Sequence, residues 1–164
     1  MKIALHSFKE KKCLALNIAA PFIPQFFKAP LQELFNYTNI LVGNEDEAAC
    51  FAKAFDIKYE NISDLALKVS KMSSYDLIVV FTQGINDTIV ASKGCVKNYP
   101  VISIDPASIV DTNGAGDAFV GGFLSQYTQG FDLDRCVSAG HYVAHTVIQR
   151  TGPSYPSEKP NFHF

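Results

Sequence analysis

The chain has 164 residues, 48% of them hydrophobic, with a formal net charge of −2 and a pI near 6.0. This is enough for one compact domain with a buried core, and we expect a single domain over residues 1–164. The slightly acidic balance argues against nucleic acid as a partner. No apolar run approaches the roughly 18 residues that a membrane helix needs, so we expect no membrane contact and a cytoplasmic protein, with entry into the nucleus left open.

The four cysteines lie far apart and form neither a C-x-x-C pair nor a Cys/His cluster. This spacing predicts neither a zinc site nor a disulfide scaffold. We expect reduced thiols in the core, as in a cytosolic protein. The cysteines are Cys13, Cys50, Cys95 and Cys136.

Two short apolar runs near the start of the chain, Cys13–Ala19 and Ile40–Val42, predict buried strands. We expect a helix after each strand. Residues 45–55 have acids in the first turn and apolar residues at helical spacing, with Asn44 at the N-cap position. Residues 63–72 repeat the helical pattern.

The clearest strand is the continuous apolar run Asp76–Phe81, which is typical of a parallel sheet covered on both faces. The remaining predicted elements are a turn at Thr82–Asp87, hairpin strands at Thr88–Ser92 and Gly94–Val101, and helices at Ala115–Tyr127 and Leu133–Arg150. Strands that alternate with helices predict an α/β protein with a mainly parallel sheet.

A glycine-rich loop, DTNGAGDAFVGG at residues 111–122, precedes one of these helices. The dinucleotide fingerprint G-x-G-x-x-G fails because Phe119 stands where the third glycine belongs. A P-loop fails because no Gly-Lys-Ser/Thr follows. What remains is a helix start at which the backbone N–H groups of Gly114, Ala115 and Gly116 are free to point outward, which is an anion site.

Asp117 lies in the first turn of the same helix, where the helix dipole favours an ionised carboxylate. A carboxylate there repels a resting phosphate, but it can accept the proton of a hydroxyl that attacks one. The alternative is that Asp117 is only a favourable first-turn acid and that the glycines only shape a turn. The chemistry favours the catalytic interpretation.

The stretch DTNGAGDAF resembles the signature of the ribokinase-like (PfkB) carbohydrate kinase family. Within that family, DTNGAGDAFVGGFLSQ and AGHYVAHTVIQRTG resemble the adenosine kinases, as do LNIAAPFIPQFFK, ILVGNEDEAACFAK and VVFTQGINDTIVA upstream, in the family's order. The resemblance implies transfer of the γ-phosphoryl of ATP to the 5′-hydroxyl of adenosine, giving AMP in purine salvage. It implies that Asp117 is the catalytic base and that Gly114, Ala115 and Gly116 form the anion hole.

The resemblance also implies roles for residues outside the helix start. Asn44 and Glu47 match the family's N-x-x-E motif, which organises Mg²⁺ and its waters, although the residues alone favour a plain N-cap for Asn44. Asn113 is expected to contact the nucleotide. Potassium is a further expected ion.

Two more sets of residues have both a structural and a functional interpretation. Thr82, Gln83 and Gly84 follow a buried strand and form either an ordinary hairpin lead-in or, by resemblance, a loop against the ATP phosphates and ribose. His141 lies on an apolar helix, where a core or capping role is the default, and the resemblance places it near the ATP base. His145 has no comparable claim.

One departure from the family is large. Nothing in residues 1–15 matches the Gly-Gly motif, the substrate-binding Asp or the β-sheet lid of the family's N-terminal half. We therefore expect an incomplete ribokinase-like three-layer sandwich that lacks this half, is inactive alone and self-associates through an uncovered sheet edge. The alternatives are a sugar kinase of the same superfamily and a non-catalytic nucleotide-binding or regulatory fragment.

Overall fold

The structure is a computed structural model and describes residues 1–73 and 76–162. The chain forms two compact units, Met1–Tyr99 and Pro100–Phe164. The first unit contains a sheet with helices, and the second contains two long helices with their connecting loops. That residues 1–164 make a single domain stays a prediction.

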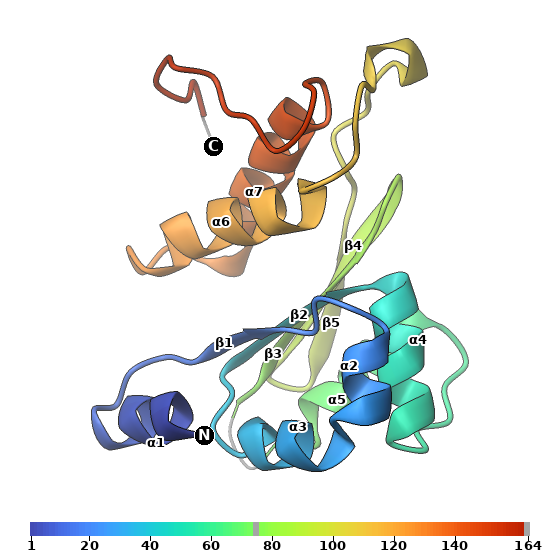
Figure 1. The fold of residues 1–164 in the computed structure, drawn as a ribbon, viewed down its shortest axis with the longest axis vertical. Coiled ribbons are helices and arrows are strands. Elements are labelled where there is room, and N and C mark those ends of the chain that lie inside the picture. The colour runs from blue at the N-terminus through green and yellow to red at the C-terminus, as the bar shows by residue number, and fades with distance from the viewer. Residues whose placement is uncertain (74–75, 163–164) are drawn as a thin grey trace. The chain divides into compact units, whose positions relative to one another are not determined.

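The first unit is built on a five-stranded sheet in the order β1-β2-β3-β4-β5 (Figure 1). Strands β1, β2 and β3 pair in parallel, and β4 is antiparallel to both of its neighbours. The predicted α/β class is confirmed, and the hairpin makes the sheet mixed. The strands are β1 (Ala15–Asn17), β2 (Ile40–Asn44), β3 (Ile78–Gln83), β4 (Asn86–Ser92) and β5 (Cys95–Tyr99).

The expectation of two buried strands near the start is right for β2 and wrong for β1. Every residue of β2 up to Gly43 is buried, whereas Ala15 is exposed and Leu16 and Asn17 are half-buried. The cause is position in the sheet: β1 is at the edge and pairs with β2 alone in the described part of the chain. Apolar periodicity shows that a segment is a strand and not where it lies in the sheet.

Helices α4 and α5 pack against the strands and close the core of this unit. The core joins Phe51 of α4, Leu65 of α5 and Phe81 of β3, all three fully buried. The helices of the unit are α1 (Lys2–Lys9), α2 (Phe22–Phe26), α3 (Lys28–Phe35), α4 (Glu45–Ala54) and α5 (Ile62–Ser70).

The helix expected after β1 is broken into α2 and α3. Pro30 explains the break, because one continuous helix would place its ring against a carbonyl four residues earlier. A new start at Lys28 puts Pro30 in the first turn of α3, where a missing N–H costs little. Helix α1 was not predicted.

The second unit packs two helices, α6 (Ala115–Tyr127) and α7 (Leu133–Val147), after a short 3₁₀ turn, η1 (Pro106–Ser108). Helix α6 has the predicted bounds, and α7 ends three residues before the expected Arg150. The carbonyl of Ile148 accepts hydrogen bonds from the N–H groups of Val110 (2.8 Å) and Asp111 (3.2 Å). The residue after α7 therefore holds the loop before α6 in place.

The two helices approach each other at a glycine. A Cβ on Gly122 would lie 2.5 Å from the carbonyl oxygen of Ala139, which is closer than real Cβ atoms come. Phe119 and Phe123 of α6 and Val137 of α7 are buried around this contact. Any side chain at position 122 would push the helices apart.

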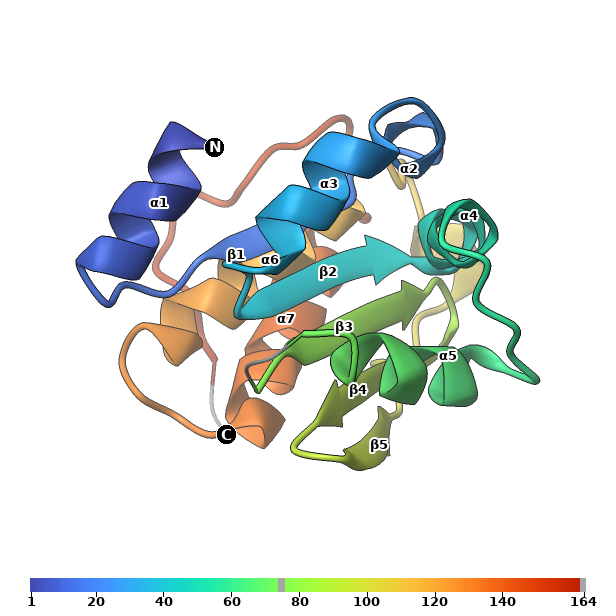
Figure 2. The same ribbon diagram turned by 90° about the horizontal axis from the view of Figure 1, so that it is seen from below.

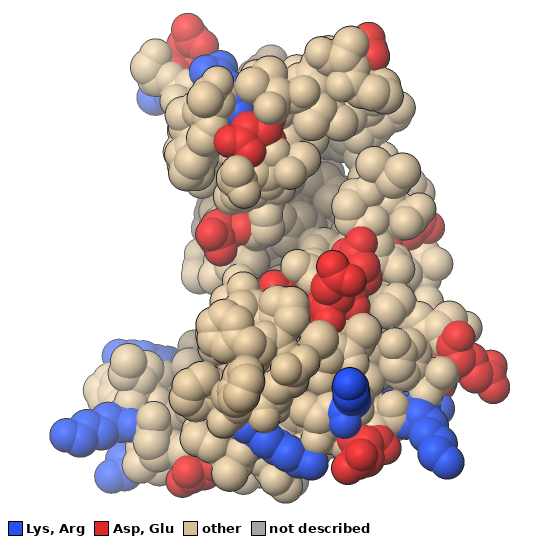
Figure 3. Space-filling model, turned by 45° about the vertical axis from the view of Figure 1, so that its right-hand side comes forward, with Lys and Arg blue, Asp and Glu red and all other residues tan. Residues whose placement is uncertain are grey.

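The surface carries no continuous basic patch on the face shown in Figure 3, where lysine and arginine side chains lie scattered among acidic ones. That nucleic acid is not a partner stays a prediction. In the described residues, no helix has both the length and the apolar character that crossing a membrane requires.

Candidate active site

The loop before α6 ends in a residue that only glycine suits. Gly114 is the N-cap of α6 and has a left-handed backbone, with φ of +79°. A Cβ there would lie 2.8 Å from the Cβ of Pro153. Both the backbone conformation and the close neighbour exclude a side chain, so this glycine fixes the direction in which the helix starts.

The Asp111 carboxylate holds the loop before α6 in place through two hydrogen bonds. One carboxylate oxygen accepts the N–H of Asn113 (2.9 Å) and the other accepts the N–H of Gly152 (3.0 Å). These two hydrogen bonds, that of Asn113 first, hold the pKa of the Asp111 carboxyl below its ordinary value. The turn to Asn113 is local and could have been found in the sequence, but the contact with Gly152 spans 41 residues and could not.

The start of α6 is open to an anion. The Ala115 N–H donates to the Thr112 carbonyl at 3.2 Å, so it is engaged and not free as expected. In the described structure no partner is assigned to the N–H groups of Gly114, Gly116 and Asp117, and Gly114 has no side chain with which to cap the helix. Three unpartnered amides at the positive end of a helix are able to receive a phosphate group.

Asp117 lies at this helix start with an exposed side chain. Among the described residues, no hydrogen bond or ion pair is assigned to its carboxylate. The carboxylate is therefore accessible to a hydroxyl of a bound molecule, and its acceptor oxygens are not used within the protein. A general base needs an acceptor that is accessible in this way.

His141 lies in the packed face of α7 and not at the helix start. Its side chain is 8% exposed, and its ring lies 5.6 Å from the Phe119 ring, tilted by 51°. The core role that the residues alone predicted is confirmed by this burial. Its contact with the ATP base stays a prediction. His145 is more accessible and pairs with Gln149 on the same helix.

In the first unit, four predicted residues lie at the carboxyl ends of two neighbouring strands. Asn44 ends β2, and Thr82 lies beside it on β3 in the register of the sheet. Gln83 follows, and its side chain donates to the Asp87 carbonyl at 2.6 Å. Gly84, with φ of +56°, begins the two-residue connection to β4. The carboxyl edge of parallel strands is where open α/β sheets bind ligands.

Asn44 and Glu47 form a complete capping box at the start of α4. The Asn44 side-chain oxygen accepts the Glu47 N–H at 2.9 Å, and the two Glu47 oxygens accept the Asn44 N–H (3.0 Å) and side-chain amide (3.1 Å). The N-cap interpretation of Asn44 is thus confirmed. Glu47 is 7% exposed, and each of its oxygens keeps a lone pair for a further donor.

This arrangement fits magnesium only through water. Among the described residues, no three His, Cys, Asp or Glu side chains cluster closely enough to hold a metal ion directly. Mg²⁺ keeps several of its waters and takes oxygens from substrate phosphates, so one carboxylate that accepts from those waters is sufficient. Glu47 can do this, and the Asn44 side-chain oxygen, which accepts only the Glu47 N–H, also keeps a lone pair.

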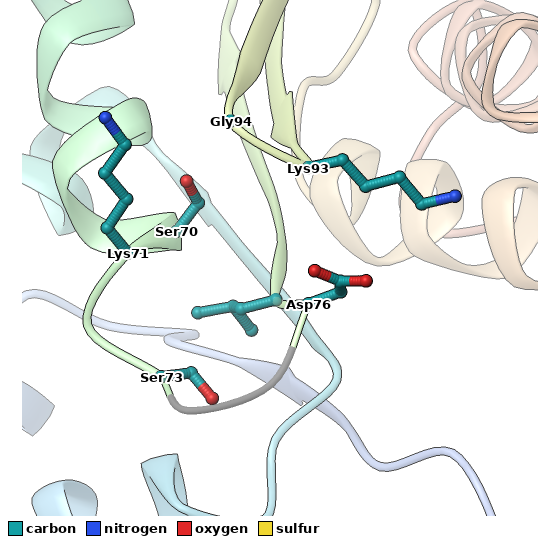
Figure 4. Close-up of a pocket in the computed structure, with 7 residues that line it drawn as sticks. Ser70, Lys71, Ser73, Asp76, Lys93 and Gly94 are labelled. Carbon is teal, nitrogen blue, oxygen red and sulfur yellow. The ribbon is translucent and has the colours of Figure 1, made fainter.

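The predicted site residues thus fall into two sets. Asn44, Glu47 and 82–84 share one sheet edge in the first unit, and residues 113–117 share one helix start in the second. A hollow of about 530 Å³ in the first unit contains none of them. Its lining includes Lys71 and Lys93, whose ammonium groups point away from each other in Figure 4. These two positive charges therefore do not converge on a common ligand.

Comparison with known proteins gives consistent results. The family profile described as pfkB family carbohydrate kinase matches residues 1–160. The chain is 42% identical to Adenosine kinase 1 of Arabidopsis thaliana over 162 residues, which are 96% of this chain and 47% of that protein. It is 40% identical to the adenosine kinase of Saccharomyces cerevisiae, over 99% of this chain and 48% of that protein.

Solved structures show the same fold. The adenosine kinase of Anopheles gambiae, in complex with P1,P4-di(adenosine-5) tetraphosphate, superimposes with a TM-score of 0.86 at 35% identity, over 94% of this chain and 49% of its own. The apo adenosine kinase of Trypanosoma brucei brucei gives 0.86 at 40% identity, over 91% and 46%. The chain therefore spans about half the length of the relatives that it matches.

Proposed function

Because the chain belongs to the pfkB family of carbohydrate kinases, we propose that it carries the ATP-binding and catalytic half of an adenosine kinase. The reaction transfers the γ-phosphoryl of ATP to the 5′-hydroxyl of adenosine and gives ADP and AMP. The proposal is supported by adenosine kinase relatives at 40–42% identity that match nearly the whole chain. The other half of these relatives, which this chain does not span, is needed for the complete enzyme.

The observation that carries the proposal is the open start of α6, where an exposed carboxylate follows unpartnered amides. Asp117 accepts the proton of the attacking hydroxyl as the new oxygen–phosphorus bond forms. The bond from the γ-phosphorus to the bridging oxygen breaks, and that oxygen leaves with ADP. The N–H groups of Gly114 and Gly116 stabilise the negative charge on the transferring group.

The residues of the first unit act on the nucleotide. Thr82, Gln83 and Gly84 lie at the carboxyl edge of the sheet, where they can contact the ATP phosphates and ribose. Glu47 would order waters of the Mg²⁺ that accompanies ATP, and the bound ion would offset phosphate charge. Asn113 lies in the loop just before the anion site, and His141 packs against the Phe119 ring of α6. Potassium stays an expectation without a described ligand set.

A sugar kinase is the second candidate, because the matching profile is that of carbohydrate kinases. Both candidates share the phosphoryl-transfer chemistry of α6 and differ in the acceptor. Acceptor recognition belongs to the half of the relatives that this chain does not span. The adenosine kinase relatives, 42% and 40% identical over nearly the whole chain, favour adenosine.

The test is a chimera in which the N-terminal half of Arabidopsis adenosine kinase 1 is joined ahead of residue 1. Transfer of labelled γ-phosphate from Mg-ATP is measured to adenosine and, in parallel, to ribose and fructose. We expect AMP formation from adenosine. Labelled sugar phosphates would establish the second candidate, and a folded chimera that binds ATP without transfer would establish a non-catalytic nucleotide-binding protein.

A further inference from the structure

The segment that follows α7, residues 151–162, is called the strap, and its first residues contact the loop before α6. The Gly152 N–H donates to the Asp111 carboxylate at 3.0 Å. Pro153 lies against Gly114, so that a Cβ placed on Gly114 would be 2.8 Å from the Pro153 Cβ. Gly114 is the N-cap of α6. The strap therefore supports the residue at which the anion site begins.

The other end of the strap is bound to α7. The Asn161 N–H donates to the Tyr142 hydroxyl oxygen at 3.0 Å, and the Phe162 and Tyr142 ring centroids are 5.6 Å apart. The Arg135 guanidinium lies 5.9 Å from the Phe162 ring centroid, within the range of a cation–π contact. Gln126 of α6 orients that guanidinium, because its side-chain oxygen accepts the Arg135 Nε–H at 2.8 Å. Figure 2 shows the strap in red, leaving α7 and returning to it.

Between its two ends the strap has few contacts. It contains no described helix or strand, and most of its side chains are exposed. At the Gly152 end, ordering the backbone costs about as much free energy as one hydrogen bond returns. Binding the other end to α7 closes the strap into a loop, which keeps Gly152 close to Asp111 and removes most of that entropic cost. Contacts on α7 therefore stabilise contacts at the start of α6. The loop is restricted further by Pro153, Pro156 and Pro160.

We propose that Tyr142, Arg135 and Phe162 form a latch, and that they are positioning residues for the anion site. Arg135 lies in the first turn of α7 and Tyr142 in its middle, whereas the anion site lies at the start of α6. The latch acts through the strap: it keeps the first residues of the strap on the loop before α6, and so fixes the direction of the Gly114 N–H. The effect on turnover rests on the proposed function, whereas the effect on the strap does not.

The first test is hydrogen exchange of the purified 164-residue chain, read on peptides by mass spectrometry. Phe162→Ala removes both ring contacts of the latch, so the Gly152 amide should exchange at least about fivefold faster. Tyr142→Phe removes only the acceptor of the Asn161 N–H and should have a smaller effect in the same direction. The amides in the middle of α6 and α7 should exchange at the parental rate in both variants, because the helix core is unchanged.

Two matched variants make this readout specific. Tyr155→Ala removes an aromatic side chain of the same strap that is 58% exposed, and it should leave the exchange unchanged. Phe162→Tyr keeps an aromatic ring at the latch and should exchange as the parent chain does. An effect of Phe162→Ala that these two variants do not share is an effect of the ring contacts.

The second test measures turnover in the Arabidopsis chimera. Phe162→Ala should lower kcat at least about threefold and change the KM for ATP less than about twofold, because a less well oriented anion site loses stabilisation of the transition state first. Calorimetry should give the parental stoichiometry of ATP binding, which excludes a loss of folded enzyme as the cause. Phe162→Tyr should keep the parental kcat.

Three results would overturn the inference: parental exchange of the Gly152 amide in Phe162→Ala, an equal effect of Tyr155→Ala, or faster exchange together with a parental kcat. The first two would show that the latch does not hold the strap, and the third that the strap does not position the anion site. A chimera without any phosphoryl transfer would count against the proposed function. The Gly152 exchange and the Gly114 amide NMR signal, which should shift in Phe162→Ala and not in Tyr155→Ala, would then decide this inference.

Discussion

Two helix starts in this chain, those of α4 and α6, solve the same problem in opposite ways. At α4, Asn44 and Glu47 satisfy each other's main-chain donors through the capping box. At α6, the N-cap is a glycine with a left-handed backbone, and three N–H groups have no assigned partner in the described structure. A helix that caps its own start is stabilised by those hydrogen bonds, whereas one that leaves its start open keeps N–H donors available to an anion.

The largest expected effect is at Asp117. In the Arabidopsis chimera, Asp117→Asn should lower kcat by at least ~10²-fold, because a general base is lost, with little change in ATP affinity. Asp134→Asn is the matched control, since Asp134 is the first-turn acid of α7, and it should keep parental turnover. Parental turnover in Asp117→Asn would show that Asp117 is not the general base. The start of α6 would then differ from that of α4 in structure only.

The glycine that opens α6 should be irreplaceable for structural reasons. Gly114→Ala should lower the free energy of unfolding by about 1–3 kcal/mol, the scale of a strained backbone conformation, and the Cβ also meets Pro153. Gly116→Ala meets open space and should be neutral or stabilising by up to about 1 kcal/mol, as expected from helix propensity. Urea denaturation measures both, and equal losses would contradict the described helix start.

At the closed start, Asn44→Ala should cost about 1 kcal/mol, the usual value of a lost N-cap. Asn61 caps α5 in the same way, accepting the Asp64 N–H at 2.9 Å, and Asn61→Ala should cost a similar amount. The pair separates stability from binding. If Asn44→Ala also weakens ATP binding while Asn61→Ala does not, Asn44 contacts the nucleotide in addition to capping α4.

Glu47→Gln should raise the magnesium concentration that the chimera needs for half-maximal activity, because a negative group that orders the ion's waters is lost. Glu45→Gln changes a neighbouring first-turn acid outside the capping box and should leave the magnesium titration unchanged. Identical titrations for the two variants would make α4 a purely structural helix start, and would sharpen its contrast with α6.

The smallest effect is a pH dependence at Asp111. Its folded pKa lies below the ordinary value of 3.8 because Asn113 and Gly152 donate to the carboxylate. The stabilisation is therefore fully present above about pH 4 and is lost as pH falls through the folded pKa. Asp111→Asn should lower the Tm at pH 7, and the difference should shrink in acid. Asp132→Asn exchanges one good N-cap of α7 for another. It should change neither the Tm at pH 7 nor the dependence of the Tm on pH.

The sequence predicted what local patterns determine. The bounds of α6 follow from a glycine loop at its start and an apolar face behind it, and residues 115–127 were predicted as they are observed. The buried strand β2 and the N-cap Asn44 were found for the same reason. Asp117, the open amides and the capping residues all lie within a few positions of a recognisable motif.

What depended on distant contacts was not predictable. That β1 lies at an edge is set by which strands exist to pair with it, and no pattern within residues 13–19 contains that information. The hydrogen bond from the Gly152 N–H to the Asp111 carboxylate joins the segment after α7 to the loop before α6, 41 residues apart in the chain. Ala115 was expected to offer a free amide, because the hydrogen bond back to Thr112 depends on the detailed turn and not on residue type.

The most direct test of the open helix start is a titration of the ¹⁵N-labelled chimera with Mg-ATP, followed by amide NMR. We expect the Gly114, Gly116 and Asp117 amide signals to shift with ATP concentration, since unpartnered N–H groups receive the phosphates. The Glu47 amide should shift less, because Asn44 already accepts its hydrogen bond at 2.9 Å. Saturating ATP binding that leaves the three α6 amides unperturbed would contradict the anion site and the function built on it.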